Sequence, residues 1–161
     1  MEQVSWDDCQ TFIAKLNELT GENFRLPTEA QWEYAARGGN QSKGYQYSGS
    51  NTLSDVAWYD NDVPWYDENN SSITTHPVAT KQPNELGLYD MSGNVYEWCQ
   101  DWYGDYSSAA VVDPTGPESG SSRVFRGGSI YASDCRISMR YDSTPSDPSY
   151  RYFFFGVRVA L

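Results

Sequence analysis

The sequence contains few of the residues that build metal clusters or disulfide frameworks. Its 161 residues include only three cysteines and one histidine. Cys9, Cys99 and Cys135 form no Cys-X-X-Cys motif, so neither a disulfide framework nor a zinc ribbon is indicated, although one pair stays open. The single histidine, His76, is too few for a histidine-based metal site, and it lacks the clear nucleophile that a triad needs. We therefore expect His76 to be a loop or packing residue.

Positive charge is also scarce. The chain has 11 Lys and Arg against 22 Asp and Glu, which gives a formal net charge of −11. A field of this sign repels phosphate backbones, so we do not expect nucleic acid as a partner. The sequence also lacks an apolar run of about 18 residues and a basic segment followed by an apolar one, so we expect no membrane span or secretory signal in it.

Aromatic residues, by contrast, are abundant. They make up 16% of the chain, which is too many for a disordered protein. The length fits one domain with a core of its own. Residues 121–161 carry six Arg and three Asp, whereas the preceding part is strongly acidic. The C-terminal quarter therefore differs chemically from the rest.

Two segments near the N-terminus have helical patterns. In the first, Ser5 stands at the N-cap position, acidic residues fill the first turn, and apolar residues recur at helical spacing up to Gly21. In the second, Thr28 and Gln31 form a capping box, and Gly38 begins a glycine pair that ends the turn. We predict two helices, each packing an apolar face on the core.

Beyond residue 40 the helical periodicity is lost. Gly, Asn, Ser, Asp and Pro interrupt the chain every few residues, and only short strand-like runs occur, at Leu86–Met91, Arg123–Phe125 and Phe153–Val159. The pattern predicts an α+β fold with two helices followed by a loop-rich antiparallel sheet. Loops of this length are typically functional or held by metal and aromatic packing.

Four motifs, in order along the chain, carry a resemblance to a known family. They are FRLPTEAQWEYAARGG at residues 24–39, GLYDMSGNVYEW at 87–98, RGGS at 126–129 and GVRV at 156–159. The sequence thereby resembles the formylglycine-generating-enzyme, or sulfatase-modifying factor, domain family. The resemblance implies a C-type-lectin-like fold and a single domain over residues 1–161. Because family domains usually start some tens of residues earlier, we expect that an N-terminal portion is missing here.

The second motif implies a calcium site. In the family, the residues matching Asp90 and Glu97 bind the ion through their side chains, and those matching Gly93 and Val95 through backbone carbonyls. Calcium takes about six to eight oxygen ligands, and a Gly-Asn turn lets carbonyls converge between two carboxylates. The alternative is that Glu97 caps backbone amides and Asp90 pairs with an arginine.

The copper site of the catalytic members has no counterpart in the sequence. Those enzymes bind copper(I) through two cysteine thiolates and activate dioxygen. Counted from Ser129, the matching positions are Ala132 and Ile137. We therefore do not expect copper. Cys135 is interpreted as a small buried hydrophobic residue, and Ser129 as a turn residue.

The C-terminal quarter has the composition of a binding surface. Antibody paratopes combine Tyr rings with small polar groups in the same way. The segment also resembles the variable region of diversity-generating-retroelement target proteins, some of which use this domain. We expect residues 130–155 to bind a protein or glycan ligand. The expected ligand-contacting residues are Tyr131, Ser133, Asp134, Tyr141, Asp142, Ser143, Tyr150, Tyr152, Phe153 and Phe154. Alternatively, Tyr152, Phe153 and Phe154 belong to a final core strand.

Two functions from different classes follow from these observations. The first is a non-catalytic, C-type-lectin-like ligand-binding module that a retroelement diversifies. The alternative is a copper-dependent formylglycine-generating oxidase or a related oxygen-dependent enzyme. Fold does not decide between them, because function resides in the site. The residues at the cysteine positions favour the binding module.

Overall fold

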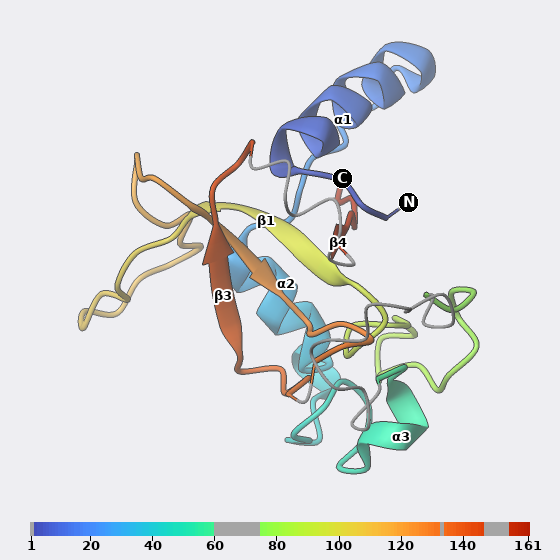
Figure 1. Cartoon of the computed structure of the whole chain (residues 1–161). Helices are drawn as coiled ribbons and strands as arrows, with labels where there is room; N and C mark the ends of the chain where they lie inside the picture. The colour runs from blue at the N-terminus through green and yellow to red at the C-terminus, as the bar shows by residue number, and fades with distance from the viewer. Residues whose placement is uncertain (1, 60–74, 133, 147–154) are drawn as a thin grey trace. The chain divides into compact units, whose positions relative to one another are not determined.

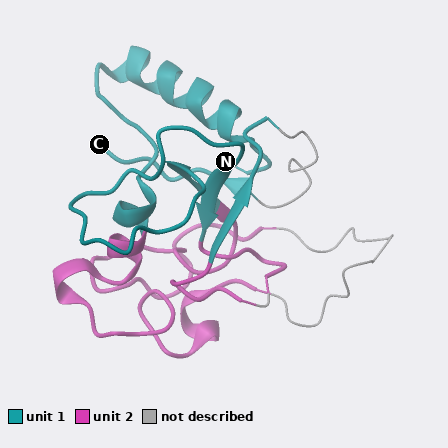
Figure 2. Ribbon diagram, turned by 90° about the vertical axis from the view of Figure 1, so that its left-hand side faces the viewer, with its two compact units in different colours: residues 1–32, 97–126, 140–161 teal, residues 33–96, 127–139 magenta. Residues whose placement is uncertain are grey.

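The computed structural model describes residues 2–59, 75–132, 134–146 and 155–161 (Figure 1). The chain forms two compact units, each assembled from separate stretches of sequence (Figure 2). Unit 1 contains residues 1–32, 97–126 and 140–161, and unit 2 contains residues 33–96 and 127–139. No helix within the described ranges has the length and apolar character needed to cross a membrane.

Helix α1 (Trp6–Thr20) begins and ends at the residues that the sequence predicts. The Ser5 side chain accepts a hydrogen bond from the Asp8 amide, and the Asp8 side chain accepts one from the Ser5 amide. Gly21 closes the helix with a φ of 76°, in the left-handed region that glycine favours. The apolar face is less covered than expected, since Phe12 and Leu19 are exposed.

Helix α2 (Glu29–Ala36) has the predicted capping box. The Gln31 amide donates to the Thr28 hydroxyl at 3.2 Å, and the Thr28 amide donates to the Gln31 side chain at 3.1 Å. Both helices thus begin through local side-chain contacts that the sequence already contains.

The sheet of unit 1 has the strand order β3-β2-β1-β4. Its strands are β1 (Tyr96–Trp102), β2 (Arg123–Arg126), β3 (Arg140–Ser143) and β4 (Phe155–Gly156). Strand β2 pairs antiparallel with both β1 and β3. The ladder between β1 and β2 shifts register between Trp98 and Trp102. Such a shift is typical of a bulge and bends the strand.

Aromatic rings fill the core of unit 1. Trp98, Phe125 and Phe155 contact one another with centroid distances of 4.7 to 5.5 Å. These rings come from β1, β2 and β4, so their packing connects the strands. On the same sheet, the Arg123 guanidinium lies 3.9 Å from the Trp6 ring centroid and 3.4 Å from that of Trp102. This cation–π sandwich attaches α1 to the sheet.

Polar side chains organise the loops of unit 2, whose described residues include the short helices η1 (Gly39–Gln41) and α3 (Leu53–Val56). The buried Asn84 amide donates to the Ala35 carbonyl at 2.8 Å and to the Ser48 hydroxyl at 3.0 Å. Its oxygen accepts from the Leu86 and Leu88 amides. One side chain therefore satisfies backbone groups that have no sheet partner.

The predicted α+β class, with two helices and an antiparallel sheet, is confirmed, and so is the strand at Arg123–Phe125. The predicted strand at Leu86–Met91 is wrong, because Asn84 holds this segment as a turn and Asp90 adopts a φ of 57°. Within Phe153–Val159 the described strand covers Phe155–Gly156. Strands β1 and β3 were not predicted from the periodicity.

Candidate functional site

Part of the predicted binding segment lies on β3. Tyr141 is half-buried and stacks on Phe125, with a centroid distance of 5.5 Å and an interplanar angle of 14°. Asp142 is exposed and accepts a hydrogen bond from the Ser122 hydroxyl at 2.6 Å. Ser143 is buried. The strand therefore presents Tyr141 and Asp142 to solvent in part, with the tyrosine ring held by the core.

Two further predicted residues lie in unit 2. Tyr131 and Asp134 are both half-buried. The Arg136 guanidinium donates to both carboxylate oxygens of Asp134, with Nε at 2.9 Å from each, and these hydrogen bonds lower the pKa of the carboxyl. This pair gives the turn a fixed polar group. The predictions for Ser133, Tyr150, Tyr152, Phe153 and Phe154 lie outside the described residues.

The Asp90 turn is built around strained, polar backbone. Asp90 and Asn94 have φ values of 57° and 64°. One Asp90 carboxylate oxygen accepts the Ala79 amide at 2.7 Å, while the other is buried and has no hydrogen-bond partner among the described residues. The Asn94 side chain bonds both the amide and the carbonyl of His76. One Asp90 carboxylate oxygen in this turn is therefore buried without a hydrogen bond from the described residues.

The Glu97 carboxylate has a different environment. Arg158 donates to both of its oxygens at 2.8 Å, and the Trp32 indole N–H donates to Oε2 at 2.7 Å. Glu97 is only 4% exposed. The alternative stated from the sequence assigns an arginine to Asp90 and backbone amides to Glu97. The structure shows the reverse, because Asp90 caps an amide whereas Glu97 pairs with an arginine. Arg158 already neutralises the charge that Glu97 would offer to a cation.

The two positions that the resemblance matches to the copper ligands are apolar and buried. Ala132 is 7% exposed and Ile137 is 2% exposed. The three cysteines are also buried and free, and burial raises the pKa of the Cys9 and Cys135 thiols to about 12. Around Cys135 the packing is tight, since a Cβ on Gly128 would lie 2.6 Å from its sulfur. A thiol in this state is a poor nucleophile and metal ligand.

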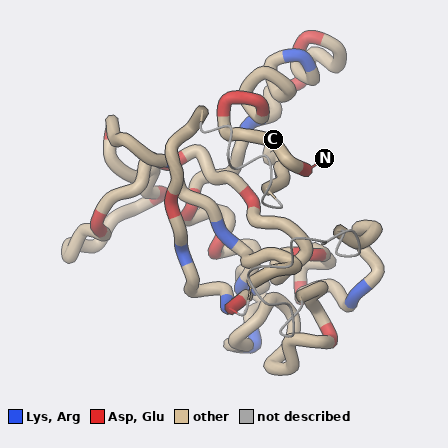
Figure 3. Tube along the Cα trace, viewed as in Figure 1, with Lys and Arg blue, Asp and Glu red and all other residues tan. Residues whose placement is uncertain are grey.

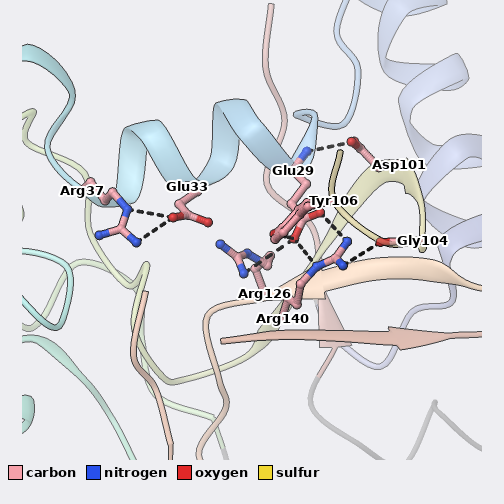
Figure 4. Close-up of polar contacts among 8 residues, drawn as sticks. All are labelled: Glu29, Glu33, Arg37, Asp101, Gly104, Tyr106, Arg126 and Arg140. Atoms are coloured by element: carbon pink, nitrogen blue, oxygen red, sulfur yellow. Dashed lines mark hydrogen bonds and ion pairs between the residues drawn. The ribbon is translucent and has the colours of Figure 1, made fainter. Parts of the chain in front are cut away.

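A buried ionic cluster, which the sequence reasoning missed, surrounds Glu29 at the start of α2 (Figure 4). Arg140 donates to both Glu29 oxygens at 2.7 and 2.8 Å, and an Arg126 nitrogen lies 3.6 Å from Oε1. Arg126 is fully buried, and Glu29 is 5% exposed. The Asp101 carboxylate accepts the Glu29 amide at 2.8 Å. Glu29 and Arg126 both lie within the family motifs, and this was the feature of the sequence that could have identified them.

Tyr106 joins the same cluster. Its hydroxyl donates to Glu29 Oε1 at 2.9 Å, and its ring centroid lies 4.3 Å from the Arg140 guanidinium. Partial desolvation of its hydroxyl and the nearby Glu29 charge raise the pKa of Tyr106 to about 12, while the side chain as a whole is 66% exposed. Arg140, Arg126 and Tyr106 all engage the Glu29 carboxylate, so the arrangement is suited to holding strands and loops in position rather than to transferring protons.

The sequence is similar to one protein-family model and to several curated proteins. Residues 1–161 match the domain described as "Sulfatase-modifying factor enzyme 1-like domain". The formylglycine-generating enzyme of Streptomyces coelicolor is 35% identical over 91% of this chain and 48% of its own length. That of Thermomonospora curvata is 37% identical over 88% and 50%. The chain thus spans about half the length of these curated relatives.

Solved structures give the same result. The Treponema denticola variable protein 1 has a TM-score of 0.79 and 32% identity, covering 99% of this chain and 69% of that one. CarF has a TM-score of 0.73 and 28% identity, covering 98% and 65%. These likenesses confirm the expected C-type-lectin-like fold.

We predict that Glu29→Gln destabilises the protein by about 3–5 kcal/mol, because it leaves buried arginines without their carboxylate. Glu18→Gln is the matched control, since Glu18 pairs with Lys15 on the exposed surface and such pairs contribute at most about 1 kcal/mol. Urea denaturation of both variants measures the difference. Equal losses would mean that the buried cluster does not stabilise the fold.

Proposed function

Since this chain belongs to the sulfatase-modifying factor enzyme 1-like domain family, we propose that it is a non-catalytic member that binds a ligand through its C-terminal segment. The observation that carries the proposal is the identity of two residues. Ala132 and Ile137 occupy the positions of the copper-binding cysteines and are buried. Without two thiolates at those positions, the soft-ligand copper chemistry of the enzymes has no donor set.

The state of the cysteines supports the same conclusion. Cys135 is the cysteine nearest in sequence to the two positions, and its raised thiol pKa opposes thiolate formation at neutral pH. Cys99 is fully buried, and desolvation raises its thiol pKa as well. The enzyme alternative rests on the 35–37% identity to formylglycine-generating enzymes. Identity at this level carries the fold, whereas the reaction depends on the thiol ligands.

The binding half of the proposal rests on residues 130–155. Tyr141 offers a half-exposed ring that stacking on Phe125 holds rigid. Asp142, the next residue of β3, offers an exposed carboxylate on the opposite face of the strand. Rigid rings bind with little loss of conformational entropy, and small polar groups supply adaptable hydrogen bonds. A protein or a glycan surface suits this chemistry. The likeness to a protein named a variable protein supports diversification of this segment by a retroelement.

We predict that the copper-treated protein does not convert cysteine to formylglycine in a sulfatase-motif peptide, because it lacks the paired thiolates. Mass spectrometry of the peptide after incubation under oxygen measures conversion. A known formylglycine-generating enzyme assayed in parallel shows that the peptide and the conditions are competent. Turnover by this protein would overthrow the non-catalytic proposal and support the oxidase.

We also propose that calcium binds at Asp90 and stabilises the fold. The buried, unpartnered Asp90 oxygen fits a cation, and the carbonyls of Gly93 and Val95 would add oxygen ligands. The Gly93 carbonyl also accepts the Val95 amide at 2.9 Å. Glu97 fits less well, because a cation there competes with Arg158. When bound, calcium would supply a positive charge that compensates Asp90.

We predict that a chelator lowers the melting temperature of the calcium-loaded protein. A ligand present at a hundred times its dissociation constant adds about 2.7 kcal/mol to stability. Asp90→Asn should abolish this dependence. Asp105→Asn, which alters an exposed carboxylate, should leave it intact. Identical melts with and without the chelator in the wild-type protein would contradict the calcium proposal.

A further inference from the structure

The segment between β1 and β2, residues 103–122, forms a closed surface loop in unit 1. Its two ends lie together, because the Tyr103 amide donates to the Ser122 carbonyl at 2.8 Å. The returning part packs against the outgoing part. A Cβ on Gly104 would lie 2.6 Å from Pro117, and one on Gly120 would lie 3.1 Å from the Trp102 side chain. Closed loops of this kind are frequently functional.

Contacts from the sheet fix the base of this loop. Arg140 donates to the Gly104 carbonyl at 2.8 Å, and its guanidinium lies 4.3 Å from the ring centroids of both Tyr103 and Tyr106. The Tyr106 hydroxyl is held by Glu29 (Figure 4). The rest of the loop projects beyond the ends of β1 and β2 (Figure 1). A rigid base lowers the entropy lost when the tip binds a partner.

The tip of the loop is apolar and exposed. Val111 is 57% exposed and Val112 is 90% exposed, and the neighbouring Ala109 and Ala110 are exposed as well. Asp113 then turns the chain with a φ of 47°, in the left-handed region. Four consecutive small apolar residues at a projecting tip form a patch that the rest of unit 1 leaves open.

The charge around this tip has one sign. Asp105, Asp113 and Glu118 are exposed, and residues 103–122 contain no Lys, Arg or His. Figure 3 shows acidic positions along the loop and no basic ones. A negative surface is repelled by anionic lipid headgroups and by nucleic acid, whereas it attracts lysine and arginine side chains. The charge therefore favours a protein partner with a basic surface.

We propose that residues 103–122 form an interaction surface for a partner protein, with Val111 and Val112 at its centre, in addition to the C-terminal segment that contacts the base of the loop through Arg140 and Asp142. Val111 and Val112 enter an apolar recess on the partner, and Lys or Arg side chains around that recess pair with Asp105, Asp113 and Glu118. The exposed rings of Tyr103 and Tyr106 supply further contact area for these cations.

A library of random peptides displayed on phage is the probe for this surface. Selection on the wild-type protein should enrich peptides that combine Lys or Arg with aliphatic residues. A synthetic consensus peptide should bind the double variant Val111→Ser, Val112→Ser at least tenfold more weakly than the wild type. Val78→Ser is the matched control, because Val78 is 76% exposed outside the loop, and it should bind as the wild type does. The wild type and both variants have the same net charge, so nonspecific attraction of a basic peptide to the acidic chain is the same for all three.

Three results would overturn the proposal. The first is no enrichment over selection on the double variant. The second is equal affinity of the consensus peptide for the wild type and the double variant. The third is binding of the wild type, but not of the double variant, to phosphatidylcholine vesicles, which would assign the tip to a membrane. Melting curves check that both variants are folded. None of these results bears on the C-terminal binding segment, which the loop variants leave unchanged.

Discussion

The buried carboxylate of Glu29 is the constraint on which unit 1 depends. The carboxylate accepts hydrogen bonds from Arg140 on β3 and from Tyr106 in the loop after β1, and it lies close to Arg126 on β2. The backbone amide of Glu29 donates to the Asp101 carboxylate on β1. Charges this deeply buried are tolerated only when every partner is present. The start of α2, three strands and the base of the 103–122 loop must therefore assemble together.

The sequence predicts the parts of this fold that local contacts determine. Ser5, Thr28 and Gly21 set helix ends through neighbours within a few residues, and each was found in its predicted role. The sheet was harder to predict, because β1 and β3 are defined by pairing with a distant strand rather than by alternation. The ion pair of Glu29 with Arg140 joins residues 111 positions apart. No periodicity within either segment contains that information.

The functional predictions differ in the same way, because some depend on local sequence and others on distant residues. Residue types at fixed offsets from the RGGS motif could be read directly, and alanine and isoleucine stand at the offsets where the family resemblance predicts thiols. The environments of Asp90 and Glu97 could not be predicted, since an arginine from the distant C-terminal motif pairs with Glu97. On unit 1, Tyr141 is half-buried and Asp142 is exposed on β3, and the acidic residues of the 103–122 loop are exposed. Exposed loops on a fixed core suit the ligand-binding role that we propose for this chain.

The central claim, that this domain lacks the copper chemistry of the enzymes, is tested most directly by a copper(I) titration. The protein competes with bicinchoninate for the ion under anaerobic conditions, and the absorbance of the bicinchoninate complex reports the transfer. Because Cys9, Cys99 and Cys135 are buried with raised thiol pKa values, we predict that the native protein removes no copper. Uptake of one copper per chain, lost in Cys135→Ser, would contradict the account.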